Sequence, residues 1–121
     1  MLVGSEDPQK LADFYTKVFG KESEMPKDGG GEGDWFGWLV GNTFFSIGHH
    51  SELSGNAKEP QRILLNFETT QVNEEYERLI GIGATPIQAP YQMQGAWIAT
   101  LADPDGNYFQ LMTPWEPTNK A

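Results

Sequence analysis

The sequence predicts an α+β fold in which a strand, a helix and about three further strands occur twice in tandem. Two observations predict this duplication. Apolar residues recur at helical spacing in two segments that lie 61 residues apart, and a glycine-asparagine pair leads into an apolar strand in two segments that lie 65 residues apart. We therefore expect a single domain over residues 1–121, with module one over about 1–55 and module two over about 60–116.

The first helix is expected from Pro8 to Phe19. Ser5 or Asp7 can cap its first backbone N–H groups, Pro8 suits the first helical position, and Gly20 can end the helix. Its apolar residues follow the i, i+3, i+4, i+7, i+8 pattern and are Leu11, Phe14, Tyr15, Val18 and Phe19. This face is typical of core packing.

Strands are expected around this helix, over residues 1–4, 35–40 and 43–48. The pair Gly41-Asn42 is typical of the two-residue turn of a hairpin. Segment 21–34 is rich in glycine, but its acidic side chains would repel a phosphate group, so the sequence predicts a flexible loop there.

The second half repeats this order. A strand over residues 62–68 precedes a helix that Gly81 is expected to end, and the apolar face of this helix consists of Val72, Tyr76, Leu79 and Ile80. Two prolines predict that residues 84–93 form an edge strand, and strands over 96–102 and 108–112 follow. Asp103-Pro104-Asp105-Gly106-Asn107 has the composition of a tight turn between these last two strands.

The charge balance excludes several classes of partner. Eight Lys and Arg residues stand against seventeen Asp and Glu, which gives a formal charge of −9 and argues against nucleic acid and anionic membranes. The chain has no cysteine, which excludes a disulfide framework and a thiolate metal site. Without a signal peptide or a membrane span, we expect a soluble, cytoplasmic protein with no membrane partner.

Two motifs resemble the vicinal oxygen chelate superfamily, which includes glyoxalase I, extradiol dioxygenases and bleomycin-resistance proteins. They are Asp7-Pro8-x-x-Leu11-x-x-Phe14-Tyr15-x-x-Val18-Phe19-Gly20 and Asp103-Pro104-Asp105-Gly106-Asn107-x-Phe109. With the internal repeat, they cover nearly the whole chain. The resemblance implies two βαβββ modules, a cupped mixed sheet with the helices outside, a bound small molecule and a homodimer.

Enzymes of this superfamily hold a divalent metal with four ligands, two in each half and usually His or Glu. The resemblance aligns the expected ligand positions with Gln110, with its repeat partner Phe45, with a position on or near Leu64, and with one at or before Met1. No imidazole or carboxylate remains at these positions, so we expect no metal and no other cofactor. The alternative is a relocated set of His49, Glu68 and Gln110 that acts as metal ligands or as an acid–base pair.

By strand alternation, the cup is expected to be apolar and aromatic with a few polar points. The expected ligand-binding residues, with Trp35 or Trp38 nearby, are Phe45, Ile47, His49, Leu64, Asn66, Trp97, Gln110 and Met112. They favour a protein that binds or sequesters a hydrophobic or aromatic small molecule without a catalytic metal. The alternative is a metal-dependent lyase, isomerase or dioxygenase. Asp103 and Asp105 resemble the start of a calcium loop, but no Glu follows at the twelfth position, and a turn is preferred.

Overall fold

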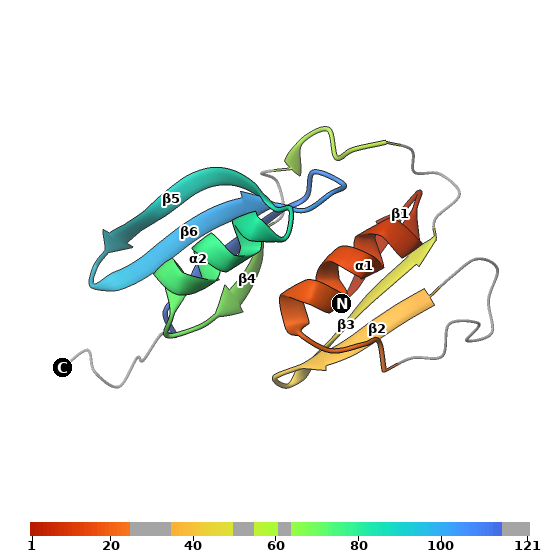
Figure 1. Cartoon of the computed structure of the whole chain (residues 1–121), viewed down its shortest axis with the longest axis horizontal. Coiled ribbons are helices and arrows are strands. Elements are labelled where there is room, and N and C mark those ends of the chain that lie inside the picture. Colours follow the sequence, from red (N-terminus) through yellow and green to blue (C-terminus); the bar gives the residue numbers. More distant parts are fainter. Residues whose placement is uncertain (25–34, 50–54, 61–63, 115–121) are drawn as a thin grey trace. The chain divides into compact units, whose positions relative to one another are not determined.

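A computed structural model describes residues 1–24, 35–49, 55–60 and 64–114 of the chain (Figure 1). It divides into two compact units, Met1–Asn56 and Ala57–Ala121, and each contains one helix and one sheet. The architecture is α+β with two tandem units, as the sequence predicts. Residues 25–34 of the predicted loop over 21–34, and His50, lie outside the described residues.

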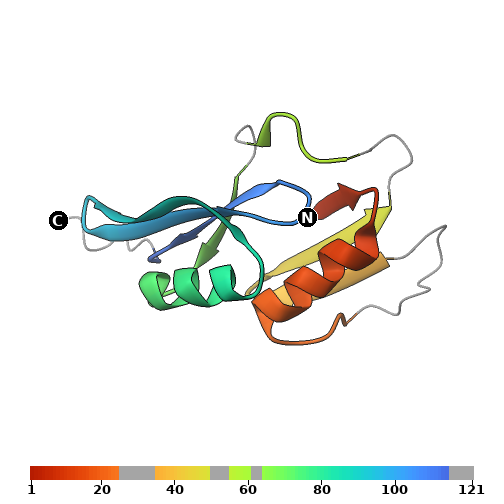
Figure 2. The ribbon, with the colours of Figure 1, turned by 45° about the horizontal axis from the view of Figure 1, so that its top comes forward.

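Unit 1 is a three-stranded mixed sheet with a helix on one face (Figure 2). Its elements are β1 (Leu2–Ser5), α1 (Pro8–Phe19), β2 (Trp35–Val40) and β3 (Thr43–His49). The strand order is β1-β3-β2, with β1 parallel and β2 antiparallel to β3. Two strands follow α1 in the part of unit 1 that the structure describes, and the turn between them is Gly41-Asn42, where Gly41 has a φ of 61°.

Local sequence signals determine both ends of α1. The Asp7 carboxylate accepts a hydrogen bond from the backbone N–H of Lys10 at 3.2 Å, and Pro8 begins the helix. Gly20 adopts the left-handed conformation with a φ of 74°, and its N–H donates to the Thr16 carbonyl at 2.9 Å. Both predicted helix ends are therefore confirmed.

An aromatic cluster holds α1 against the sheet. Tyr15 and Phe45 are almost fully buried, with ring centroids 4.9 Å apart, and Phe19 lies 5.4 Å from Trp38 and 5.5 Å from Phe45. Ile47 is fully buried and lies two residues beyond Phe45, on the same face of β3. The expectation that Phe45 and Ile47 point into an open cup is therefore wrong, because both side chains form the core beneath α1.

The segment after α1 covers the free edge of β2. The Glu24 carboxylate accepts from the Leu39 N–H at 2.9 Å and from Lys21 Nζ at 2.7 Å, while the Glu24 N–H donates to the Gly37 carbonyl at 2.7 Å. The Trp38 indole N–H donates to the Lys21 carbonyl at 2.9 Å. These bonds pair backbone groups that an edge strand would otherwise leave open to another chain.

Unit 2 has the same topology with one additional strand (Figure 1). Its elements are β4 (Leu65–Glu68), α2 (Val72–Gly81), β5 (Thr85–Met93), β6 (Ala96–Ala102) and β7 (Tyr108–Met112). The strand order is β4-β7-β6-β5, with β4 parallel to β7 and the other pairs antiparallel. β4, β7 and β6 thus correspond to β1, β3 and β2, and unit 2 is a complete βαβββ module.

Local sequence signals also bear on the edge position of β5 and on the C-terminal end of α2. β5 is an edge strand, as its prolines predict, and its pairing register with β6 shifts between Pro86 and Gln88. α2 ends at Gly81, the repeat counterpart of Gly20, but the left-handed glycine of the turn that follows is Gly83, whose φ is 112° and whose N–H donates to the Ile80 carbonyl.

The internal repeat has a different register in the strands from the one the sequence suggests. Phe109 is fully buried and contacts Phe67 at 5.8 Å, so its structural counterpart is the buried Phe45, 64 residues earlier. The glycine-asparagine pairs lie 65 residues apart, and this offset matches Gln110 with Phe45. It differs by one residue from the offset of the buried phenylalanines. Because a shift of one residue exchanges the two faces of a strand, the counterpart of Gln110 is Ser46.

None of the helices in the described parts of the chain is long and apolar enough to cross a membrane.

Truncating the core under α1 should destabilise the protein strongly. Phe14 is 5% exposed and packs edge-on against Tyr15, so Phe14→Ala should lower the free energy of unfolding by about 3–5 kcal/mol. Urea unfolding followed by circular dichroism measures the loss. The exposed Lys10→Ala variant on the same helix should stay within about 0.5 kcal/mol of the wild type. Equal effects of the two substitutions would contradict this packing.

Acid should remove the stabilisation that Glu24 gives to the β2 edge. The hydrogen bond from Lys21, and secondarily that from the Leu39 N–H, holds the pKa of Glu24 below its ordinary value of 4.5. This contribution is therefore present above that value and is lost as the pH falls through the lower pKa of the folded state. We expect Glu24→Gln to unfold at lower urea than the wild type at about pH 7, with the gap closing as the pH falls below 4.5 and through the lowered pKa of Glu24. Glu77→Gln, on exposed α2 surface, is the control, and a gap that persists in acid would contradict the prediction.

Candidate functional site

A row of uncharged polar side chains crosses the sheet of unit 2. Asn66 is the register partner of Gln110, Gln110 is the partner of Thr100, and Thr100 is the partner of Gln88. The row therefore includes one residue from each of β4, β7, β6 and β5. The Gln110 amide donates to the Thr100 hydroxyl at 3.4 Å. We call these four residues the polar row.

The polar row lies on the sheet face opposite the core of unit 2. Phe109 and Leu111, which alternate with Gln110, are buried together with their partners Leu101 and Ala99. On the other face, which we call the open face, a second row contains Glu68, Met112, Ile98 and Tyr91. Donors and acceptors are thus placed beside an apolar strip.

The structure brings some of the predicted binding residues together on this face. Asn66, Gln110 and Met112 share it, and Leu64, just before β4, is 40% exposed. Trp97, which is also among the expected ligand-binding residues, alternates with Ile98 onto the opposite face of β6 and does not share a face with Gln110. The sequence did not indicate Thr100 and Gln88, because only the strand register shows that they continue the row.

In unit 1, the open face is the side of the sheet away from α1. It carries Phe44 and Ser46 from β3 and Leu39 from β2, which alternate with the buried Phe45 and Trp38. Ser46 is the counterpart of Gln110, and its hydroxyl donates to the Met1 carbonyl at 3.1 Å. Leu39 and Phe44 are 51% and 41% exposed, so this face is mainly apolar.

His49 does not join the open face of its own unit. It ends β3, is exposed, and alternates with Ile47 and Phe45 onto the face that α1 covers. Of the alternative set of His49, Glu68 and Gln110, the last two share the open face of unit 2, in adjacent rows. His49 belongs to the other unit.

The donors at the expected ligand positions do not fit a divalent metal. After the register correction these positions are Ser46 with its parallel partner Leu2, and Gln110 with its parallel partner Asn66. They offer a hydroxyl, an alkyl chain and two amides, whereas divalent metals in proteins are held by imidazole and carboxylate groups. Over the described ranges, no group of three or more His, Asp or Glu side chains could hold a metal ion.

Asp103 supports the turn between β6 and β7. Its side chain, in a residue only 4% exposed, accepts from the backbone N–H groups of Asp105 and Asn107 at 2.9 Å each and from the Asn107 amide at 3.1 Å. Gly106 completes the turn with a φ of 83°. A carboxylate with three N–H donors is satisfied by the turn itself, so the structure favours the turn over the calcium loop.

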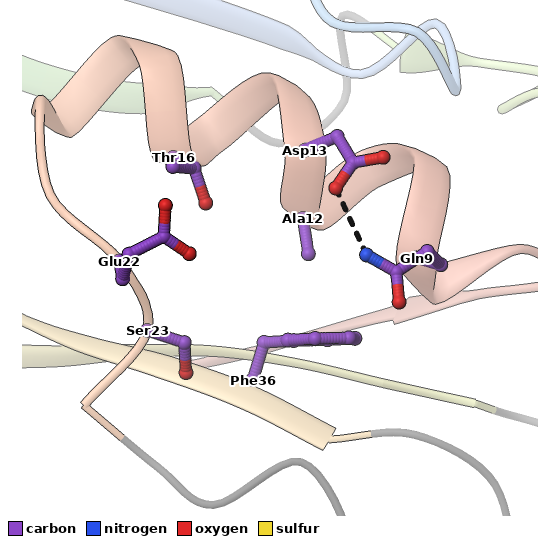
Figure 3. A pocket seen from close by; sticks show the side chains of 7 residues that line it. All are labelled: Gln9, Ala12, Asp13, Thr16, Glu22, Ser23 and Phe36. Atoms are coloured by element: carbon purple, nitrogen blue, oxygen red, sulfur yellow. Dashed lines mark hydrogen bonds between the residues drawn. The ribbon is translucent and has the colours of Figure 1, made fainter.

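A separate hollow of about 330 Å³ lies between α1, the segment that follows it, and β2 (Figure 3). Its lining is mostly polar and consists of Gln9, Ala12, Asp13, Thr16, Glu22, Ser23 and Phe36. Gln9 donates to Asp13 at 2.9 Å, and the Ser23 hydroxyl is bonded to the backbone of Gly37. The sequence does not predict this hollow, although the polar side chains at positions 9, 13 and 16 share a helix face. Its position on the helix side of the sheet separates it from the open face.

Comparisons with known proteins agree with this topology. The model of the Glyoxalase-like domain family matches residues 1–112. A glyoxalase/bleomycin resistance protein/dioxygenase family enzyme from Burkholderia phytofirmans PsJN is similar, with 25% identity and a TM-score of 0.73 over 93% of this chain and 94% of that one. Hypothetical protein SA1046 from S. aureus has 20% identity and a TM-score of 0.74 over 93% of this chain and 90% of that one.

A third similar structure is that of the fosfomycin resistance protein FosX from Mesorhizobium loti. It has 16% identity and a TM-score of 0.67, over 100% of this chain and 94% of that one. No curated protein matches the sequence. Because the family model covers most of the chain and the topology agrees, the chain belongs to the glyoxalase-like family, within the glyoxalase/bleomycin resistance/dioxygenase (vicinal oxygen chelate) superfamily.

Proposed function

We propose that this protein binds a small molecule on the open sheet face and that it does so without a catalytic metal. The observation that carries the proposal is the polar row, which has the amides of Gln110 and Asn66 where the superfamily resemblance leads one to expect metal ligands and continues across the sheet with Thr100 and Gln88. Amide and hydroxyl groups orient a ligand by hydrogen bonds and require no ion. Binding or sequestration is the function that this chemistry supports best.

The chemistry of the face also limits the ligand. Three amides and a hydroxyl offer both donors and acceptors without a formal charge, and the adjacent row contributes apolar surface from Met112 and Tyr91. They suit a mainly apolar or aromatic molecule with a neutral polar edge. The formal charge of −9 further disfavours an anionic ligand. We also propose that the protein is cytoplasmic and forms a homodimer.

The second candidate is a metal-dependent lyase, isomerase or dioxygenase with relocated ligands. Glu68 favours it to a limited degree, because this carboxylate lies on the open face one row from Gln110. A single carboxylate beside amides is a weak site for a divalent ion. We therefore prefer the binding function.

Removing the Gln110 amide should weaken ligand binding and leave the fold intact. The wild type, Gln110→Ala and the matched control Gln92→Ala are screened against one library of neutral aromatic amides and alcohols by ligand-observed NMR. Gln92 lies in the same sheet, as the partner of Trp97 on the opposite face. Loss of one neutral hydrogen bond should weaken the compounds that bind by about 2–12-fold in Gln110→Ala only.

Two outcomes would contradict the proposal. One is that Gln110→Ala binds these compounds as tightly as the wild type does, and the other is that the wild type binds none of them. A Gln110→Ala protein that fails to fold, judged by circular dichroism, would show that Gln110 is structural, and Asn66→Ala would then test the row.

A further inference from the structure

Trp35 occupies an unusual position on the open face of unit 1. It is the register partner of Gly48 in β3, and Gly48 is the partner of Gly4 in β1. Its neighbour Phe36 pairs with the buried Ile47, so alternation places Trp35 on the face away from α1. Trp35, Gly48 and Gly4 therefore form one row across the sheet, which we call the indole row, and two of its three residues have no side chain.

The indole ring lies flat over Gly48. A Cβ atom added to Gly48 would fall onto Cζ3 of Trp35 and would come within 2.6 and 2.7 Å of the adjacent ring atoms Cε3 and Cη2. A point at nearly the same distance from three consecutive ring atoms lies over the face of the ring and not beyond its edge. One face of the indole thus rests on the backbone at Gly48, and the opposite face is directed away from the sheet.

Trp38, in the same strand, shows that this arrangement is not ordinary core packing. Trp38 is fully buried, its ring contacts Phe19 and Phe45, and its indole N–H is bonded to a backbone carbonyl. Trp35 remains partly exposed on the other side of the sheet. The sequence places a glycine under it where a larger residue would lift the ring, and this keeps the indole parallel to the sheet.

The residues next to the indole row extend the surface. The adjacent row consists of Gly37, Ser46 and Leu2, and the exposed pair Leu39 and Phe44 follows. Gly37 has no side chain, and the two exposed apolar side chains follow it in the register. Such a surface accommodates a flat, apolar molecule whose ring can stack on the indole in an offset arrangement.

We propose that the indole of Trp35, seated on Gly48, is the stacking surface for a planar aromatic ligand and selects such ligands over saturated ones of the same size. This inference rests on the proposed function, small-molecule binding on an open sheet face, and names the chemical class of ligand that the open face of unit 1 would take. The charge of −9 favours a neutral or cationic ring system.

The test compares two neutral probes of matched shape, 2-naphthalenemethanol and its fully saturated decahydro analogue. Their binding to the full chain is measured by NMR titration, with the Trp35 indole N–H resonance assigned from a Trp35→Leu variant. The wild type should bind the aromatic probe about tenfold more tightly than the saturated one. Trp35→Leu, and Gly48→Ala, whose methyl displaces the ring, should each abolish this preference.

Trp97→Leu is the control, because Trp97 is another partly exposed tryptophan but belongs to the sheet of unit 2, and it should keep the full preference. If Gly48→Ala does not fold, the preference of Trp35→Leu between the two probes tests the proposal by itself. Equal binding of both probes by the wild type, or an unchanged preference in Trp35→Leu, would overturn the stacking role and leave the proposed function standing. A wild type that binds neither probe, together with a negative library screen, would overturn both.

Discussion

The packing of one helix on one face of each sheet is the constraint on which the rest of this molecule depends. In unit 1 it is made by the aromatic contacts of Tyr15 and Phe19 with Phe45 and Trp38. Once these rings are buried, strand alternation assigns every other residue of β2 and β3 to a face. The open face then consists of the residues between the buried ones, and the chemistry available to a ligand follows from that assignment.

The same constraint in unit 2 gives a chemically different face. Phe109 and Leu111 are buried, so Gln110 and its partners Asn66 and Thr100 lie on the opposite side. Unit 1 has glycines, Ser46 and exposed apolar side chains at the corresponding rows, and the indole of Trp35 lies over Gly48 there. The open face of unit 2 is therefore suited to hydrogen bonding, and that of unit 1 to stacking.

Local sequence signals predicted most of the fold. Pro8 and Gly20 correctly marked the ends of α1, Gly41-Asn42 marked a hairpin, and the prolines of β5 marked an edge strand, because each acts through the backbone of its own segment. α2 ends at Gly81, the repeat counterpart of Gly20, but the left-handed glycine of the following turn is Gly83, which the repeat does not indicate.

The site was harder to predict because it depends on pairing between distant strands. The glycine-asparagine repeat aligned the halves at 65 residues, whereas the buried phenylalanines align at 64. Because of this difference of one residue in the alignment, Phe45 and Ile47 were expected in the cup and Ser46 was not identified as the counterpart of Gln110. Gln110, Asn66 and Met112 share one face of their sheet, as strand alternation within that half predicts. The places of Thr100 and Gln88 in the polar row, and the contact of Trp35 with Gly48, can be found only from the strand register.

The metal content of the full chain shows whether the open face binds its ligand without a metal. The protein is purified without a chelator and analysed for nickel, zinc, iron and manganese by elemental analysis, with a His49→Ala variant prepared in parallel. We expect metal far below one ion per chain in both preparations. Stoichiometric metal in the wild type that disappears in His49→Ala would contradict it.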